Sequence, residues 1–267
     1  MRVLVHGGAG GTPADPEPRQ AVLDEAAVAV LEDDPQFNAG VGGAVQSDGR
    51  VRTDAGVMTA DRRIGAACSM EGVANAVSAA RVVLEETPHV LVSGDHAVDL
   101  AADSGVDTGV ELLTDDRREA YEDADPPEGS PRDHLDWMRE RFGGFDTVGA
   151  VAVRDGDVAA ATSTGGRLYA LAGRVGDVPQ AGSGFYAAPA GGASATGDGE
   201  DISRVTLTRR AVQFLEGGMG AQSAADAALD EFEDVTGATA GLIVLDADGR
   251  TGAAFNSADM QTAAATR

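Results

Sequence analysis

Thr147 stands at the junction of a glycine turn and an apolar stretch, and its hydroxyl is the clearest candidate nucleophile of this 267-residue chain. Gly143 and Gly144 predict a turn, and residues 148–153 predict a strand that begins directly after Thr147. A threonine whose own amine acts as the base is a known type of nucleophile. The amine of Thr147 is part of a peptide bond, so this chemistry requires the chain first to cut itself between Asp146 and Thr147. The sequence therefore predicts an enzyme together with a maturation step.

Two more threonines lie beside glycines and are candidates to assist Thr147. Thr164 precedes a pair of glycines, and Thr196 precedes Gly197. A hydroxyl next to backbone N–H groups that no side chain covers is what an oxyanion hole requires. The alternative is that β-branched threonines simply favour strands. That alternative explains each threonine singly, whereas the repeated combination with glycines favours a site.

Arg174 and Asp177 lie between these threonines, in a short segment that begins with Gly173 and contains Gly176. An Arg and an Asp held between glycines can bind opposite charges, such as the carboxylate and the ammonium group of an amino acid. Taken alone, the segment equally allows a salt bridge between Arg174 and Asp177 on the surface. Both interpretations remain open at this point.

The elements that must position these residues form two blocks separated by an acidic segment. In the first block we expect strands at 2–5 and 51–58 and helices at 20–32, 71–86 and 96–103. In the second we expect a hairpin of 148–153 with 158–162, helices at 202–216 and 221–232, and a hairpin of 241–245 with 251–255. The segment 114–144 is acidic and contains Pro126 and Pro127, which predicts a mobile linker. Strands at both ends and helices in blocks predict helices layered on sheets.

Several kinds of site are disfavoured. The four histidines are scattered and no H-E-x-x-H or C-x-x-C motif occurs, so we expect no catalytic metal. His89 and His96 flank an expected strand and are expected on the surface. The glycines after His6 lack the G-x-G-x-x-G pattern and lead into prolines, which disfavours a nucleotide site. We interpret this glycine segment as a tight turn that helps to position the active site.

The net charge of −24 indicates the environment rather than the reaction. All basic residues are Arg, and such an acidic surface repels nucleic acid and anionic membranes. Molar salt shortens the Debye length to about 3 Å and screens this self-repulsion. We therefore predict a halophilic, cytoplasmic protein, and full stability in dilute buffer would contradict the halophilic part. The lone Cys68 excludes an intramolecular disulfide.

The ordered set of motifs resembles the plant-type (type III) L-asparaginase/isoaspartyl peptidase family of N-terminal nucleophile hydrolases. The resemblance covers nearly the whole chain, and no one motif is decisive. The motifs are His6-Gly7-Gly8-Ala9-Gly10, residues 31–42, Thr147-Val148-Gly149-Ala150, Thr162-Ser163-Thr164-Gly165-Gly166, Gly173-Arg174-Val175-Gly176-Asp177, Thr196-Gly197-Asp198-Gly199-Glu200, Gly241-Leu242-Ile243 and Phe255-Asn256-Ser257.

The resemblance implies roles for single residues. Thr147 matches the nucleophile of both self-cleavage and hydrolysis, and Thr164 matches the threonine that hydrogen-bonds its new amine. The remaining matches are Thr196 and Gly197 for the oxyanion hole, Asn38 near the nucleophile, Arg174 for the substrate α-carboxylate, Asp177 for the α-ammonium group and Gly199 for a backbone substrate contact. The main-chain carbonyls of one loop match ligands of a structural sodium ion: Leu31, Glu32, Asp34, Phe37, Ala39 and Val41.

The same resemblance implies a fold and an assembly. The fold is an α+β, αββα four-layer sandwich in one domain, 1–267. Self-cleavage yields an α-subunit, 1–146, and a β-subunit, 147–267, and two cleaved αβ units form a homodimer. The implied substrates are L-asparagine and β-aspartyl dipeptides, and the product is L-aspartate. The resemblance implies no catalytic cofactor.

Two departures from the family keep alternatives open. Asp146 precedes the nucleophile where the asparaginase branch usually has Gly, which resembles the glycosylasparaginase branch and allows hydrolysis of glycosylated asparagine. The stretch between the glycine segment and Leu31 has room for one helix where the family has two. This apparent loss motivates a second alternative, an uncleaved and inactive relative that acts as a binding protein.

Overall fold

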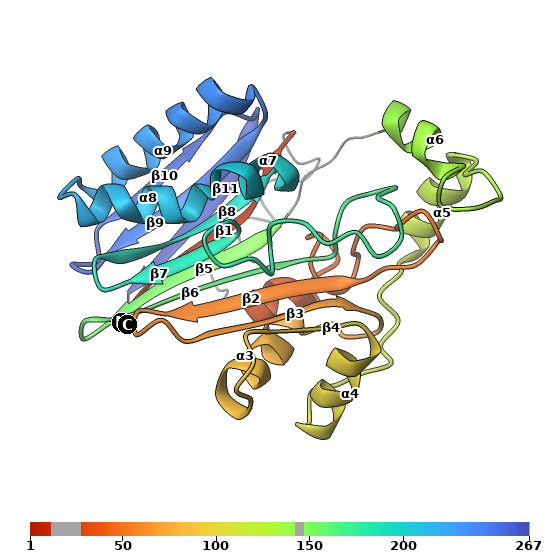
Figure 1. The fold of residues 1–267 in the computed structure, drawn as a ribbon, viewed down its shortest axis with the longest axis horizontal. Coiled ribbons are helices and arrows are strands. Elements are labelled where there is room, and N and C mark those ends of the chain that lie inside the picture. Colours follow the sequence, from red (N-terminus) through yellow and green to blue (C-terminus); the bar gives the residue numbers. More distant parts are fainter. Residues whose placement is uncertain (12–27, 142–146, 267) are drawn as a thin grey trace.

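The computed structural model describes residues 1–11, 28–141 and 147–266 of the chain, and it is a mixed α+β structure with two β-sheets (Figure 1). This confirms the α+β class. The expected helix at 20–32 begins outside the described residues, of which Val28–Asp33 form helix α2. The apparent loss of a helix before Leu31 also falls on residues outside this range.

The larger sheet has seven strands in the order β11-β1-β5-β6-β2-β3-β4. Their bounds are Arg2–Gly10 for β1, Thr53–Thr59 for β2, Ile64–Met70 for β3, Leu91–Ser93 for β4, Val148–Arg154 for β5, Asp157–Thr164 for β6 and Asp259–Thr266 for β11. The β5–β6 pair is the hairpin expected around Asp155-Gly156-Asp157, because its turn chemistry is local and strong. Strand β5 starts directly after Thr147.

The smaller sheet has four strands in the order β10-β9-β8-β7. They comprise Phe185–Ala188 (β7), Gly191–Gly197 (β8), Ala240–Asp246 (β9) and Thr251–Phe255 (β10). The β9–β10 pair confirms the expected final hairpin. Strand β8 ends at Thr196 and Gly197, so the second hydroxyl and glycine pair also lies at a strand end.

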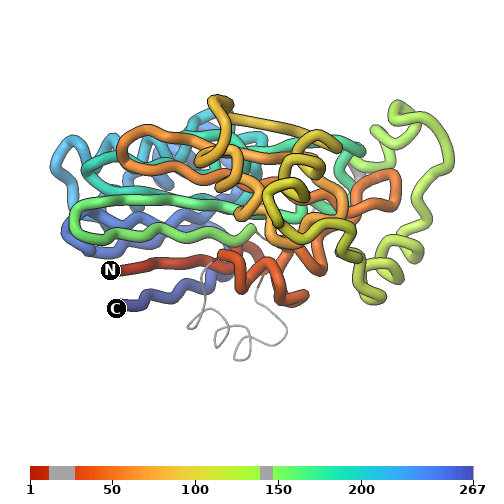
Figure 2. The backbone as a smooth tube through the Cα atoms, turned by 90° about the horizontal axis from the view of Figure 1, so that it is seen from below, coloured from red at the N-terminus to blue at the C-terminus, as the bar shows by residue number. Residues whose placement is uncertain are grey.

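The expectation that the glycines after His6 form a turn is wrong. Strand β1 continues through them to Gly10, with a register shift between His6 and Ala9. The reason is a long-range pairing that no local pattern reveals, since the C-terminal strand β11 runs antiparallel to β1 along this stretch (Figure 2). Gly8 has a φ of 103° at the shift, a conformation that glycine adopts freely.

Apolar side chains of both sheets share one core. Leu4 and Val151 of the larger sheet cluster with Phe185, Ile243 and Leu245 of the smaller one, all buried. Strands β5 and β6 accordingly lie against β7 and β8. Across the described residues, valine, alanine and leucine make up most of the buried apolar side chains, as the low aromatic content of 4% predicts.

Helices cover the outer sides of the two sheets (Figure 1). Helix α3 (Ala76–Glu86) packs on β2 and β3 through a cluster of small residues, beside α4 (Asp95–Asp103). Helices α8 (Leu207–Glu216) and α9 (Ala221–Thr236) pack on β8, β9 and β10. The expected single helix at 202–216 is broken, because Thr206 is left-handed with a φ of 52° and separates α7 (Gly199–Val205) from α8.

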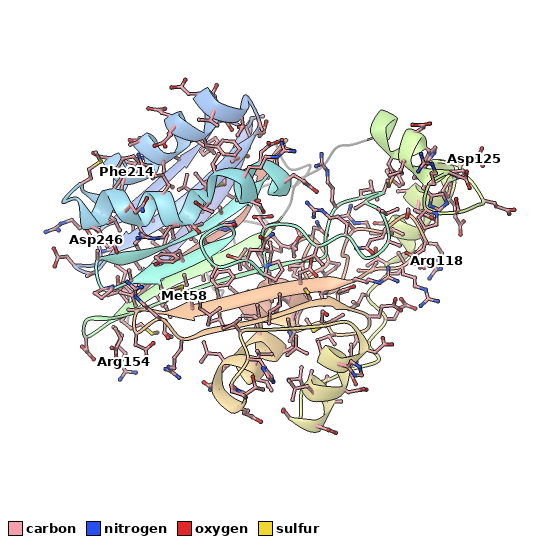
Figure 3. The ribbon with its side chains drawn as sticks, viewed as in Figure 1. Met58, Arg118, Asp125, Arg154, Phe214 and Asp246 are labelled. Atoms are coloured by element: carbon pink, nitrogen blue, oxygen red, sulfur yellow. The ribbon has the colours of Figure 1, made fainter. Side chains whose placement is uncertain are left out.

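The acidic segment 114–144 contains regular structure within the described residues. Helices α5 (Asp115–Asp123) and α6 (His134–Arg141) occur in it, the first capped by the Thr114 hydroxyl. Figure 3 shows this region, with Arg118 and Asp125, at one end of the molecule. Its mobility remains a prediction. No helix in the described part of the chain combines the length and apolar character needed to cross a bilayer.

Candidate active site

Thr147 and Thr164 meet where the β5–β6 hairpin opens. The Thr147 hydroxyl lies 3.3 Å from that of Thr164, and both side chains are buried. The Thr164 oxygen also accepts a hydrogen bond of 3.1 Å from the Gly166 N–H. The antiparallel register brings the start of one strand beside the end of the other, which explains why residues 17 apart touch. Asp146 lies outside the described residues.

Asn38 fixes the glycine turn that follows Thr164. Its amide nitrogen donates to the Gly166 carbonyl at 2.7 Å, and its carbonyl oxygen accepts from the Ala44 N–H at 2.7 Å. A Cβ on Gly165 would lie 2.4 Å from the Gly43 Cα and 2.7 Å from Asn38 Oδ1. Only glycine fits here, because backbone passes against backbone.

His6 is a functional candidate that the sequence interpretation missed. Its ring is fully buried and lies against the backbone of Thr147, and burial lowers its pKa to about 3, so it is neutral at neutral pH. Nε2 lies 2.9 Å from the Ser194 hydroxyl, which lies 2.7 Å from that of Thr162. This chain of polar groups crosses from one sheet to the other. His89 and His96 are exposed, as expected.

Thr196 and Gly197 lie on the facing sheet, at the end of β8. Thr196 is fully buried, and its hydroxyl oxygen accepts a weak hydrogen bond of 3.4 Å from the Ala9 N–H. Strand β1, which carries Ala9, pairs with β5, the strand that follows Thr147. Gly197 has a φ of 136°, and a Cβ there would lie 2.4 Å from the Thr239 carbonyl oxygen. The contact with Ala9 leaves the Thr196 O–H available as a donor.

The charged side chains of Arg174 and Asp177 lie together beside Gly199 and form a charged cluster. A Cβ on Gly199 would lie 2.5 Å from Asp177 Oδ1 and 2.9 Å from Arg174 Nη2, so glycine lets these two groups approach the start of α7. The alternative of a mutual surface salt bridge is wrong, because Asp177 is buried and Arg174 pairs with Glu200 through two bonds of 2.8 Å. Burial raises the pKa of Asp177 to about 6 although the charge of Arg174 opposes this.

Asp54 is a second buried carboxyl group in this cluster, and it was not foreseen. It pairs in register with Thr164 on the neighbouring strand, and its electrostatic partners are Arg174 and Asp177. Its Oδ1 accepts from the Ser69 N–H at 2.7 Å. Burial raises its pKa to about 7. Asp54 therefore connects the hydroxyl pair with the charged cluster, and a lone acid in an otherwise apolar strand was its one sequence signal.

The loop 31–41 folds back on itself beside the hydroxyl pair. The Glu32 carbonyl accepts from the Val41 N–H at 2.9 Å, and the Asp34 carbonyl accepts from the Phe37 N–H at 3.0 Å. Leu31, Phe37 and Ala39 are fully buried. The Glu32 side chain is also buried, and its carboxyl group accepts from the hydroxyl of Ser163, the neighbour of Thr164. Burial raises the pKa of Glu32 to about 8, so it is protonated at neutral pH.

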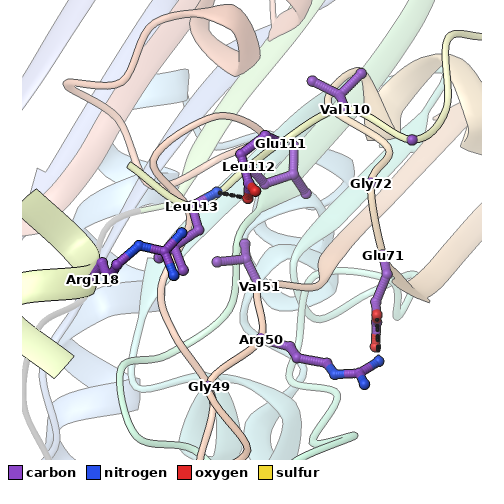
Figure 4. A pocket seen from close by; sticks show the side chains of 11 residues that line it. Gly49, Arg50, Val51, Glu71, Gly72, Val110, Glu111, Leu112, Leu113 and Arg118 are labelled. Atoms are coloured by element: carbon purple, nitrogen blue, oxygen red, sulfur yellow. Dashed lines mark hydrogen bonds and ion pairs between the residues drawn. The ribbon is translucent and has the colours of Figure 1, made fainter. Parts of the chain in front are cut away.

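A hollow of about 490 Å³ is lined by a different set of residues (Figure 4). It is lined by Gly49–Val51, Glu71 and the stretch Gly109–Leu113, with Arg118 at one side. Arg50 in its wall pairs with Glu71 at 2.9 Å, and Arg52 pairs with the same carboxylate. None of the residues predicted to do chemistry is among its lining residues.

Comparisons of the sequence with known proteins place the chain in a family. A family model described as asparaginase matches residues 17–267. The plant-type L-asparaginase of Thermococcus kodakarensis is 39% identical over 258 residues, covering 92% of this chain and 83% of the relative. The plant-type L-asparaginase of Pyrococcus furiosus is 36% identical, with 98% and 95% covered. The isoaspartyl peptidase/L-asparaginase of Homo sapiens is 38% identical, with 90% and 78% covered.

The chain therefore belongs to this asparaginase family of hydrolases, which confirms the resemblance inferred from its motifs.

Proposed function

We propose that this protein hydrolyses L-asparagine and β-aspartyl (isoaspartyl) peptides to L-aspartate, with Thr147 as nucleophile. The observation that carries the proposal is the 3.3 Å contact between the buried hydroxyls of Thr147 and Thr164, at the first residue before β5. The family membership and the names of the relatives, L-asparaginase and isoaspartyl peptidase, support the substrate class.

Maturation precedes hydrolysis in this proposal. The Thr147 oxygen attacks the Asp146 carbonyl carbon, the peptide nitrogen leaves, and the resulting ester is hydrolysed by water. This frees the Thr147 amine, whose pKa near about 8 suits a general base close to neutral pH. The hydroxyl of Thr164 supports the new amine. The products are an α-subunit of residues 1–146 and a β-subunit of residues 147–267.

Hydrolysis then uses the same oxygen. The amine takes the Thr147 hydroxyl proton while the oxygen attacks the side-chain amide carbon of the substrate. The Thr196 hydroxyl and the Gly197 N–H donate to the oxyanion that forms, and such donors typically accelerate acyl transfer by about 10²–10³ each. Ammonia or a peptide amine leaves, and water releases aspartate from the ester.

Recognition rests on charge. Arg174 binds the α-carboxylate of the substrate, Asp177 binds its α-ammonium group, and the backbone of Gly199 lies between them. Asp177 Oδ2 is buried and without a hydrogen-bond partner in the described structure, as expected of a carboxylate that binds a ligand.

The architecture and assembly of the family extend this proposal. The two facing sheets with outer helices support an αββα four-layer sandwich, and we propose a homodimer of cleaved units. The loop 31–41 presents main-chain oxygens around a tight turn, and at Gly40 a Cβ would lie 2.2 Å from the Glu32 carbonyl oxygen. This close approach of backbone suits a sodium ion held by the carbonyls of Leu31, Glu32, Asp34, Phe37, Ala39 and Val41.

The test is a denaturing gel combined with an ammonia assay on purified protein. We expect two bands for the wild type, which correspond to residues 1–146 and 147–267. We expect a single full-length band for Thr147→Ala and slower cleavage for Thr147→Ser, which keeps a hydroxyl. A persistent full-length band in the wild type would favour an inactive binding protein. Asparagine, a β-aspartyl dipeptide and glycosylasparagine are compared as substrates, and turnover of glycosylasparagine alone would contradict the proposal.

A further inference from the structure

Arg174 already holds a carboxylate that belongs to the protein. Its Nε donates to Glu200 Oε1 at 2.8 Å and its Nη2 donates to Oε2 at 2.8 Å. Two parallel bonds of this kind are the geometry in which arginine binds a free carboxylate ligand. A second guanidinium, that of Arg167, lies 3.6 Å from the same Glu200 oxygen. Glu200 therefore occupies the position where two arginines converge.

The two partners differ in how firmly they are held. The side chains of Arg174 and Arg167 are 17% and 12% exposed, whereas that of Glu200 is 45% exposed. The Arg174 guanidinium lies against the backbone of Gly176, where a Cβ would come within 2.6 Å of Nη1. Glu200 stands on the first turn of α7 and can rotate into solvent without leaving a packed core. The carboxylate is thus the mobile partner of a fixed cation.

The surrounding charges favour a substrate carboxylate that replaces Glu200 over one that binds beside it. Asp177 and Asp54 interact with Arg174, and Asp198 lies 3.4 Å from Arg167. With Glu200, four carboxyl groups face two guanidinium groups. A substrate carboxylate meets the least repulsion if Glu200 leaves as it enters, since like charges in a partly buried site repel strongly.

We propose that Glu200 is an internal competitor for the substrate α-carboxylate, which it imitates on Arg174 until the substrate displaces it. The proposal rests on the proposed function, in which Arg174 is the carboxylate ligand. It makes Glu200 a specificity-determining residue. A molecule with an α-carboxylate displaces the internal one, whereas 3-aminopropionamide, which is asparagine without that group, does not open the site.

The experiment compares Glu200→Gln with the matched control Asp201→Asn in the cleaved protein. Asp201 stands on the same helical turn and carries the same charge, but it pairs with Arg204 at 2.6 Å. A partly exposed ion pair contributes modestly to affinity, so we expect the KM for asparagine and the Kd for L-aspartate, measured by calorimetry, to fall about three- to tenfold in Glu200→Gln. We expect Asp201→Asn to change neither by more than about twofold, as befits an exposed pair. 3-Aminopropionamide should gain less from Glu200→Gln than asparagine does.

Each outcome decides the question. A rise of KM and Kd in Glu200→Gln would show that Glu200 orients Arg174 for the substrate. Unchanged values would show that Glu200 neither competes with the substrate nor orients Arg174. Either outcome would overturn the proposal. If Glu200→Gln does not fold, Glu200→Asp keeps the charge with a shorter reach and should shift Kd in the same direction. A cleaved wild type that neither binds L-aspartate nor hydrolyses asparagine would refute the proposed function itself.

Discussion

The surroundings of Thr147 and those of Arg174 adjoin where Asp54 pairs with Thr164, yet they are built from opposite chemistry. Around Thr147 the groups are hydroxyls, amides and backbone. Even the ionisable side chains there are neutral at neutral pH, because burial lowers the pKa of His6 to about 3 and raises that of Glu32 to about 8. Around Arg174 the groups are charged and buried, and Asp177 keeps an unpartnered oxygen.

This difference separates two tasks. The neutral region is buried and close-packed, which suits a nucleophile that must be positioned before any substrate arrives and that first acts on its own chain. In the charged region, one oxygen of the buried Asp177 carboxylate lacks a partner, which the ammonium group of a zwitterionic substrate would supply. Self-cleavage therefore depends on the first region, and recognition depends on the second.

Gly165→Ala should produce the largest effect, because it disturbs the neutral region. The added Cβ would lie 2.4 Å from the Gly43 Cα, where only backbone can move. Overpacking of this kind typically destabilises by about 1–3 kcal/mol. We expect self-cleavage to slow by at least about tenfold, since a shift of about 1 Å at a reacting group costs more than that. A time course of band intensity on denaturing gels measures it.

Gly220→Ala is the matched control. The same methyl group meets no atom within 4 Å there, and the backbone φ of −70° accepts alanine. Normal cleavage in Gly165→Ala would show that the close approach near Asn38 does not position the nucleophile.

Gly199→Ala should have the next largest effect, and it should affect recognition alone. Its Cβ would lie 2.5 Å from Asp177 Oδ1 and 2.9 Å from Arg174 Nη2, so it would disturb the two charged groups that bind the substrate in our proposal. We expect the KM for asparagine to rise about tenfold, equivalent to about 1.4 kcal/mol, while self-cleavage proceeds at the normal rate. Loss of substrate affinity together with loss of self-cleavage would contradict the separation of the two tasks.

Local signals explain which elements were predictable. The hairpin β5–β6 and the position of Thr147 before it follow from turn residues and β-branched runs a few positions apart. The continuation of β1 through Gly7 and Gly8 was not predictable, because it depends on pairing with a strand more than 250 residues later. The break at Thr206, whose φ is 52°, likewise has no signal in the local composition.

The site shows the same division. Arg174 and Asp177 were recognisable because glycines flank them within five residues. Asp54 and Glu200 were not, because their importance arises from burial and from partners that lie far away in the sequence. Burial is a property of the folded molecule, so the pKa of Asp54 and the pairing of Glu200 had no signature in the order of residues.

The pH dependence of hydrolysis should reveal the charged region. Burial raises the pKa of Asp177 to about 6, so this carboxyl group is protonated below that pH and loses its attraction for an ammonium group. Protonation of the Thr147 amine already lowers kcat/KM for asparagine below a pH of about 8, and we expect this fall to steepen as the pH drops through about 6, by up to a further tenfold per pH unit. Initial rates from pH 4 to 8 measure this, and a steepening that appears only near pH 4, the usual range of aspartate, would refute it.

Asp54→Asn should have the smallest effect on turnover, and its effect on stability should depend on pH. The pKa of Asp54 is raised to about 7 in the folded state from an ordinary 3.8, so the folded protein binds the proton more tightly than the unfolded one. The stabilisation from that proton is complete below pH 3.8 and is lost as the pH rises through 7. Asparagine does not titrate, and its amide oxygen can still accept from the Ser69 N–H.

The stability of the variant relative to the wild type should therefore increase from pH 4 to pH 8, by on the order of a few kcal/mol. Thermal unfolding at these two pH values checks the sign. A relative stability that stays constant or decreases would mean that Asp54 is ionised throughout this range, held by Arg174. That outcome would contradict the raised pKa of Asp54, because the charge of Arg174 would then outweigh the effect of burial.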